Sequence, residues 1–304
     1  MNKNYVRIAG GLGNQLFQIS FGRNLPGSTT YFHFGDYEIE TAEKIIDNFE
    51  GTLLNLENHW AFNKIANLTL RFGSVQQSNK FLKRILEILV IRQANKALRT
   101  KVAFSLRNSL GFVGQDMSAS QEPQLYIGYF QSYIFAGKLQ EINQSLLTAR
   151  ELEFFNKYSE IALLEKPIAL QVRLGDYLGE STFGIPSVAY FRAGLQEIDE
   201  SNSRKIWVFT NENDKVFNFL PMEIASRCRI IDEPSASPPL MLTIMSLAND
   251  FVISNSTFGW WAAYLKVNQK GKVVVPDPWF AKANVPNDLI PPEWIKIEAG
   301  FRDE

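Results

Sequence analysis

The chain has 304 residues, of which 45% are hydrophobic and 21% charged, with 31 basic residues against 32 acidic ones. That length suits one large domain or two ordinary ones, and the composition excludes wholesale disorder. A net charge of −1 provides no broad positive field for nucleic-acid binding, so we expect no nucleic-acid partner.

Rare residue types and the lack of long apolar runs exclude further classes. Cys228 is the only cysteine, which rules out an intrachain disulfide framework and a cysteine-based zinc site. With two histidines, His33 and His59, a histidine-rich metal site is also excluded. We find no uncharged apolar run of about 18 residues and no signal-peptide region, so we expect a soluble, cytoplasmic protein.

The N-terminal segment predicts the opening of an α/β unit. The β-rich run Val6–Ala9 breaks at the glycines of Gly10–Gly13 and passes into a helical pattern of apolar residues from Leu16 to Phe21. Glycines let a backbone approach a ligand closely. This loop is therefore either a ligand-binding loop or a plain tight turn.

Residues from about 41 to 158 have a mostly helical pattern, and the part from 80 to 107 is rich in lysine and arginine. Apolar side chains in Phe81–Arg92 follow the i, i+3, i+4 spacing of an amphipathic helix. Such a basic helix either contacts an anionic membrane surface from the cytoplasmic side or packs in the core with a solvated basic face.

From about residue 160, strands and helices alternate at the spacing of a parallel sheet with helices on both faces. The expected strands are 168–172, 206–209, 229–231, 251–253 and 272–275, and the expected helices are 188–198, 214–220, 240–247 and 258–266. We therefore predict two α/β domains, 1–158 and 159–304, the first being the more helical.

Polar residues follow two of these strands, where ligands of parallel sheets bind. After the first strand, Arg173 could grip a phosphate group, or it could form a structural ion pair with Asp176. After another strand, Ser254–Thr257 delivers small polar residues to the start of an apolar helix. These residues could cap the helix or form an anion site with its N–H groups, and the adjacent Trp260 and Trp261 are expected in the core.

Several familiar motifs are absent. The sequence contains neither G-x-x-x-x-G-K-[ST] nor G-x-G-x-x-G, and no D-x-D pair that could hold a divalent metal against a diphosphate. Together with Arg173, this pattern favours a metal-independent enzyme that handles a nucleotide or nucleotide sugar.

Five segments, in order along nearly the whole chain, resemble glycosyltransferase family 11, the α-1,2-fucosyltransferases. The family's G-G-L-G-N-Q-M-F-Q is matched at Gly10–Gln18 with a single change, and its H-x-R-R-G-D-Y corresponds to Gln171–Tyr177. Its I-x-N-S-S-F-S-W-W-A-A-W-L corresponds to Ile253–Leu265. Gly128–Ser132 resembles its G-Y-W-Q-S, and Pro276–Phe280 its P-x-x-W-F.

This resemblance implies a GT-B fold of two facing Rossmann-like domains, with the acceptor mainly on the first and the donor on the second. It implies inverting transfer of fucose from GDP-β-L-fucose to the 2-hydroxyl of a galactose-containing glycan, without a cofactor or metal. The site residues that it implies are Arg173 for catalysis, Gln171, Asn255, Ser256, Thr257 and Phe258 for the donor, and Gly11, Gly13, Asn14 and Gln15 for the acceptor side. Because neither histidine lies in a matched motif, Asp176 is the candidate catalytic base, or else it braces Arg173.

Three of the chain's departures from the family pattern bear on its function. Gln171 replaces a histidine, Leu174 replaces a second arginine, and Met241 stands where many members carry an aspartate. These changes keep two alternatives open: a glycosyltransferase with another nucleotide-sugar donor, and an inactive sugar- or nucleotide-binding homologue.

Overall fold

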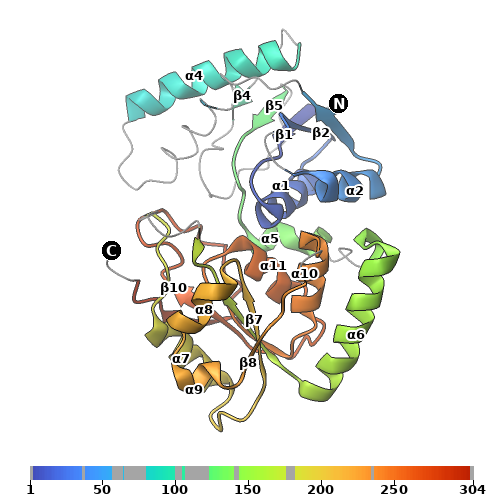
Figure 1. Cartoon of the computed structure of the whole chain (residues 1–304). Helices are drawn as coiled ribbons and strands as arrows, with labels where there is room; N and C mark the ends of the chain where they lie inside the picture. Colours follow the sequence, from blue (N-terminus) through green and yellow to red (C-terminus); the bar gives the residue numbers. More distant parts are fainter. Residues whose placement is uncertain are drawn as a thin grey trace. The chain divides into compact units, whose positions relative to one another are not determined.

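A computed structural model describes residues 3–35, 38–56, 64, 80–99, 105–106, 123–139, 144–175, 182–233 and 236–301. The chain forms two compact units (Figure 1). Unit 1 comprises residues 1–141 and 283–291, and unit 2 comprises 142–282 and 292–304. Each unit contains one parallel sheet, so the predicted α/β class is confirmed.

The division between the units differs from the predicted division after residue 158. Helix α6 (Ala149–Glu165) belongs entirely to unit 2, because Trp207 packs edge-on against Tyr158 and donates from Nε1 to Glu165 at 2.7 Å. The short segment 283–291 returns to unit 1, where Asp288 accepts a hydrogen bond from the Ser132 hydroxyl.

The sheet of unit 1 has the strand order β3-β2-β1-β5-β4, and every neighbouring pair is parallel. The strands are β1 (Lys3–Arg7), β2 (Ser28–His33), β3 (Thr52–Asn55), β4 (Ser105–Leu106) and β5 (Gln124–Tyr126). The helices are α1 (Leu12–Asn24), α2 (Glu40–Asn48), α4 (Lys80–Ala97) and α5 (Tyr133–Ala136). Three of the strands, β3 to β5, lie in the stretch expected to be mostly helical. They have only two to four residues each, too few to show a clear period-2 pattern.

Helix α4 packs its C-terminal half into the core of unit 1. Val90 and Ala94 are fully buried beside Phe32 and Leu125, whereas Ile88, nearer the start of the helix, is 59% exposed. This half of α4 therefore matches the interpretation of a core helix. Its exposed face carries basic residues: Arg92, Lys96 and, just beyond the helix, Arg99.

The sheet of unit 2 has the parallel order β11-β10-β9-β6-β7-β8. Its strands are β6 (Ile168–Val172), β7 (Ile206–Thr210), β8 (Cys228–Ile230), β9 (Asp250–Val252), β10 (Val273–Asp277) and β11 (Ile295–Glu298). The remaining helices are α7 (Val188–Ile198), α8 (Asn213–Phe219), α9 (Met222–Ala225), α10 (Pro238–Ser246) and α11 (Thr257–Tyr264). Each strand and helix predicted beyond residue 160 is present, within about two residues at either end.

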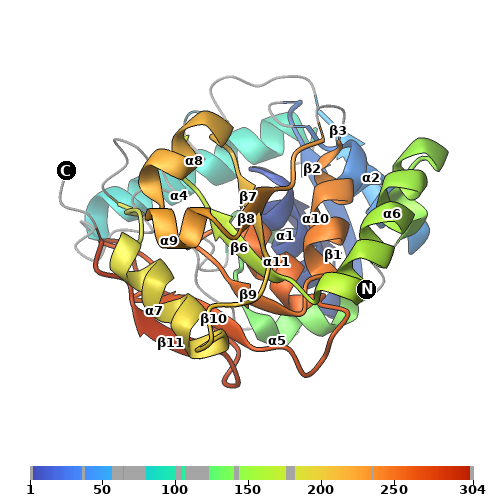
Figure 2. The same ribbon diagram turned by 60° about the horizontal axis from the view of Figure 1, so that its bottom comes forward.

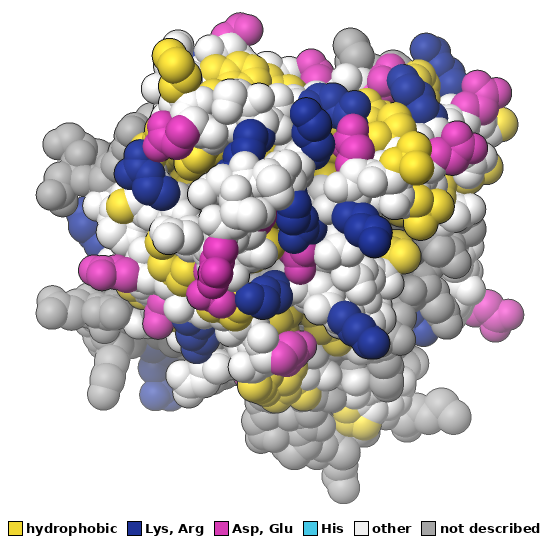
Figure 3. Space-filling model, turned by 90° about the horizontal axis from the view of Figure 1, so that it is seen from below, with side chains coloured by type: hydrophobic (Ala, Val, Ile, Leu, Met, Phe, Trp, Pro, Cys, Tyr) yellow, Lys and Arg dark blue, Asp and Glu magenta, His cyan; other side chains and the backbone are white. Residues whose placement is uncertain are grey.

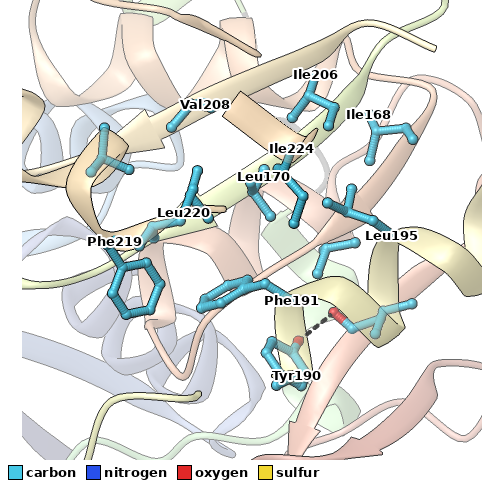
Figure 4. Close-up of a cluster of buried hydrophobic side chains, with 14 of the residues drawn as sticks. Ile168, Leu170, Tyr190, Phe191, Leu195, Ile206, Val208, Phe219, Leu220 and Ile224 are labelled. Carbon is cyan, nitrogen blue, oxygen red and sulfur yellow. Dashed lines mark hydrogen bonds between the residues drawn. The ribbon is translucent and has the colours of Figure 1, made fainter. Parts of the chain in front are cut away.

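Helices cover both faces of this sheet, with α7, α8 and α9 on one side and α6, α10 and α11 on the other (Figures 1 and 2). Alternate residues of the strands serve the two faces: Val208 joins the cluster of Phe191 and Leu220 shown in Figure 4, while Trp207 faces α6. Such two-sided burial accounts for the continuous apolar runs of these strands.

Basic and acidic side chains intermingle on the face shown in Figure 3, without gathering by sign. Elsewhere and independently of this view, charged side chains among the described residues pair, as Arg192 does with Glu223 at 2.8 Å and Arg229 with Glu165 at 2.8 Å. Figure 3 thus gives this face a mixed charge, in keeping with the near-zero net charge of the chain.

Candidate functional site

The strand order of unit 2 reverses direction between β6 and β9. Strand β6 comes first in the chain, β7 and β8 extend the sheet on one side of it, and the chain then crosses to β9 on the other side. Ligands of open parallel sheets bind at such a reversal, beyond the carboxyl ends of the strands. Arg173 follows β6, and Ser254–Thr257 follows β9, so the structure brings these two predicted segments together.

The turn that carries Arg173 is fixed from the neighbouring strand. The Leu174 N–H donates to Asn211 Oδ1 at 3.0 Å, and Asn211 follows β7. Leu174 itself is 4% exposed and belongs to the core of unit 2. Arg173, in contrast, is partly exposed. The side chain that replaces the family's second arginine is therefore a core residue, which leaves Arg173 as the cation of this turn.

The first turn of α11 can bind an anion. Ser256 is its N-cap but accepts no hydrogen bond through its side chain, and the first turn contains no acidic residue. Thr257 and Phe258 are partly exposed. Because the first N–H groups of a helix lack intrahelical acceptors and lie at the positive end of its dipole, this turn suits a phosphate or carboxylate.

Asn255 has a bracing contact. Its Nδ2 donates to the carbonyls of Phe183 at 2.9 Å and Gly184 at 3.1 Å, and the residue is 1% exposed. The Asn255 side chain thus ties the loop before α7 to the end of β9. Trp260 and Trp261 are both fully buried, as predicted for core residues.

In unit 1, the same topological argument selects the ends of β1 and β5, because β1 lies between β2 and β5. The loop after β1 contains Gly10, whose φ of +83° favours glycine, and Gly11, the exposed N-cap of α1. Gly13 is buried within the first turn of α1. As in α11, this turn has no acidic residue and no side-chain cap.

Two glutamines brace this loop from within. Gln15 is 1% exposed and donates from Nε2 to the carbonyls of Gly10 at 2.8 Å and Glu38 at 2.7 Å. Gln18 accepts from the Ala9 N–H at 2.9 Å and donates to the Gly128 carbonyl at 2.8 Å. The structure therefore buries Gln15, a predicted acceptor-side residue, and joins the loops after β1 and β5 through Gln18.

Asn14, in the first turn of α1, has a partly exposed polar side chain that Gln131 holds in place. Gln131 Nε2 donates to Asn14 Oδ1 at 3.1 Å, and Gln131 is 1% exposed. With its oxygen occupied in this way, Asn14 keeps its amide N–H groups as donors. Sequence reasoning did not single out Gln18 or Gln131, although both lie in the segments that carry the family resemblance.

Two predicted features need separate mention. Asp176 lies outside the described residues. Among those that are described, no three His, Cys, Asp or Glu side chains are grouped so as to hold a metal ion, and no helix is long and apolar enough to cross a membrane.

The thiol of Cys228 is protonated near neutral pH. Burial raises its pKa to about 12, and the positive charge of Arg227, which lowers the pKa, only partly offsets this effect.

Fold and site together define an α/β protein with two parallel sheets, in which Arg173 and the uncapped start of α11 follow the two strands at the switch point of the second sheet. The model of the family described as glycosyl transferase family 11 matches residues 123–298, more than half of the chain. The chain belongs to glycosyl transferase family 11 and is a glycosyltransferase, which confirms the resemblance noted in the sequence.

Individual relatives share about a quarter of their residues with this chain or fewer. An α-1,2-colitosyltransferase of Escherichia coli is 26% identical over 317 residues, covering 96% of this chain and 98% of the relative. Among solved structures, the fucosyltransferase NodZ from Bradyrhizobium aligns with a TM-score of 0.46 at 10% identity, covering 87% of this chain and 92% of that one. The E. coli ADP-heptose lps heptosyltransferase II aligns with a TM-score of 0.44 at 13% identity, covering 98% and 90%.

Proposed function

We propose that the protein transfers L-fucose, or a closely related sugar, from a GDP-linked donor to the 2-hydroxyl of a galactose-containing glycan, forming an α-1,2 linkage in surface polysaccharide synthesis. The observation that carries this proposal is the meeting of Arg173 and the first turn of α11 at the β6–β9 switch point. Membership of family 11 supports the reaction class, and the colitosyltransferase relative supports the α-1,2 linkage.

In this proposal the donor diphosphate lies between Arg173 and the N–H groups at the start of α11. As the acceptor hydroxyl attacks the anomeric carbon, the bond to the diphosphate oxygen breaks and negative charge builds on the departing GDP. A guanidinium and helix N–H groups that already face this charge stabilise the transition state more than the ground state. The acceptor proton passes to a base, for which Asp176 is the candidate.

The acceptor would bind at the edge of unit 1, where Asn14 keeps its amide N–H groups as donors and the backbone at Gly11 is open. Amide donors of this kind bind sugar hydroxyls without adding charge. Donor and acceptor sites would then lie on different units, each at the switch point of its own sheet.

The identity of the donor sugar is the finer part of the proposal. Colitose, which the curated relative transfers by name, is L-fucose without the 3-hydroxyl. Leu174 replaces a family arginine and lies in the core, and Met241, which replaces a family aspartate, is partly exposed. We propose GDP-L-fucose as the donor and GDP-colitose as the alternative, which these replacements keep open.

The test is nucleotide release from a panel of nucleotide sugars, with Arg173→Ala as the diagnostic variant. We expect turnover with GDP-fucose or GDP-colitose and a loss of about a hundredfold or more in Arg173→Ala. Arg192→Ala is the matched control, because Arg192 pairs with Glu223 on the surface. Full activity in a folded Arg173→Ala protein would remove the central assignment, and GDP binding without turnover would favour an inactive homologue.

We also propose that the basic region 80–107 contacts anionic membranes. Arg84, Arg92, Lys96 and Arg99 are exposed, and Ile88 offers an exposed apolar side chain beside them. The protein should sediment with phosphatidylserine vesicles at low salt and dissociate at high salt, because surface charge attraction is screened. No binding at low salt would end this part of the proposal.

A further inference from the structure

Behind the proposed donor site lies a buried contact between strands β6 and β9. The Gln171 carbonyl accepts from the Ser254 N–H at 3.1 Å, and the Gln171 side-chain Oε1 accepts from the Ser254 hydroxyl at 2.8 Å. Gln171 is 4% exposed and Ser254 is fully buried. Two hydrogen bonds, one of them between side chains, thus join the end of β6, which leads to Arg173, to the segment between β9 and α11.

Gly259 completes this contact from the first turn of α11. A Cβ atom at residue 259 would lie 2.5 Å from Gln171 Oε1 and 2.9 Å from Gln171 Cδ. Both distances are shorter than the contacts that Cβ atoms make with other heavy atoms in proteins. The backbone here is helical, so the need for glycine is steric. The Gln171 amide occupies the space that a side chain at 259 would require.

We propose that Gln171, Ser254 and Gly259 form a single packing unit that positions the donor site, with Gln171 as a positioning residue. Gln171 lies two residues before Arg173 on the same face of its strand, and Gly259 follows the N–H groups of Thr257 and Phe258. The unit fixes the separation between the guanidinium and the start of α11, which must match the length of a diphosphate. This inference rests on the proposed nucleotide site.

The experiment is a double-mutant cycle on nucleotide affinity, measured by titration calorimetry with GDP, UDP and ADP. Gly259→Ala should weaken nucleotide binding about tenfold, and Gln171→Ala about threefold, because each disturbs the shared contact. In the double variant Gln171→Ala/Gly259→Ala, the new methyl group enters the space left by the amide. The double variant should therefore bind the nucleotide no more weakly than Gly259→Ala does. Its loss of affinity relative to the wild type should be well below the product of the losses in the two single variants.

Gly22→Ala in unit 1 is the matched control. Gly22 is also a buried helical glycine, and its Cβ would lie 2.5 Å from the Tyr31 hydroxyl oxygen. It should lower the melting temperature without changing nucleotide affinity, which separates a positioning effect from a loss of stability.

The outcomes distinguish this inference from the proposed function. Wild-type affinity in Gly259→Ala, or strictly multiplicative effects in the double variant, would overturn the packing unit while leaving GDP as the donor nucleotide. Tighter binding of UDP or ADP than of GDP would overturn the proposed donor. The affinities of the double-mutant cycle would then be compared for the nucleotide that binds most tightly. Failure of the wild-type protein to bind any of the three would overturn both.

Discussion

At the scale of single residues, Asn14 and Gln131 show how one buried amide can orient another. Gln131 donates to Asn14 Oδ1 at 3.1 Å, and its own Oε1 is buried without a hydrogen-bond partner in the described part of the chain. A buried polar atom left unsatisfied costs about 1–3 kcal/mol. Such a cost is tolerated more readily in a functional site than in an ordinary core.

We predict that Gln131→Glu lowers turnover about tenfold, because a carboxylate cannot donate to Asn14 Oδ1 and would draw the Asn14 N–H groups toward itself. Steady-state kinetics with a galactoside acceptor would measure the loss, which should resemble that of Asn14→Ala. The exposed Gln144→Ala serves as control. Unchanged kinetics in Gln131→Glu would mean that the orientation of the Asn14 amide is unimportant.

Neighbouring glycines of the same loop should respond in opposite ways to alanine. Gly11 has ordinary extended dihedrals, φ −68° and ψ 170°, and a Cβ there would meet nothing within 4 Å. Gly10 has a φ of +83°, and its Cβ would lie 2.9 Å from Asn14 Nδ2. Only Gly10 is thus required by the fold itself.

Gly10→Ala should therefore destabilise the protein by about 1–2 kcal/mol, whereas Gly11→Ala should melt like the wild type. If the acceptor approaches the open backbone at Gly11, that variant should raise the acceptor KM several-fold. Calorimetry and kinetics on the two purified variants would test both parts. A Gly11→Ala enzyme with wild-type KM would place the acceptor away from this loop.

At the scale of elements, the start of α6 links two helices of unit 2. Glu151 accepts from the Thr148 N–H at 2.8 Å in a capping box, and its other oxygen accepts from the Ser237 N–H at 3.3 Å, at the N-cap of α10. Burial raises the pKa of Glu151, but the hydrogen bonds from Ser237 and Thr148 outweigh it and hold the pKa below its usual range.

We predict that Glu151→Ala costs about 1 kcal/mol at pH 7, or a few degrees in Tm. A carboxyl with a lowered folded-state pKa stabilises the fold above its unfolded pKa, about 4.3, and this contribution is lost as the pH falls through the folded value. The Tm difference between wild type and Glu151→Ala should accordingly shrink below about pH 4. Glu153→Ala, on an exposed position of the same helix, should show no such difference at either pH.

Elements with strong periodicity could be predicted from the sequence, and those formed by tertiary contact could not. Strands β6 and β7 are apolar over their whole length because both faces are buried, and Val188–Ile198 has a clear helical pattern with Ser187 as its cap. Short strands such as β4 and β11 depend on a neighbouring strand for their hydrogen bonds. Their sequences alone give too little pattern to identify them.

The same distinction holds for the candidate site. Arg173 and Ser256 were accessible to sequence reasoning because each follows a recognisable strand. Asn211, which fixes the turn after Arg173, lies 37 positions beyond its partner Leu174 and carries no motif. The burial of Leu174 was likewise hidden, since a residue after a strand can point to either side of the sheet.

At the scale of the whole molecule, both sheets follow one rule of construction. In each, the first strand of the unit lies inside the sheet, with later strands added on both sides of it. The helix start at each reversal has neither an acidic first turn nor a side-chain cap. At the reversal of unit 2, Arg173 follows the neighbouring strand β6.

The positive charge of Arg173 beside the start of α11 leads to a prediction about metal ions. A diphosphate that is neutralised by Arg173 and by helix N–H groups needs no divalent cation, so turnover should survive dialysis against EDTA within about twofold. Added Mg²⁺ or Mn²⁺ should not restore activity to Arg173→Ala, because the described residues include no group of carboxylates that could hold a divalent ion. Arg173→Lys should keep part of the activity, since lysine supplies the charge without the paired hydrogen bonds of a guanidinium. If EDTA abolished turnover and Mn²⁺ restored it, the diphosphate would be held by a metal, and the role assigned to Arg173 would have to be given up.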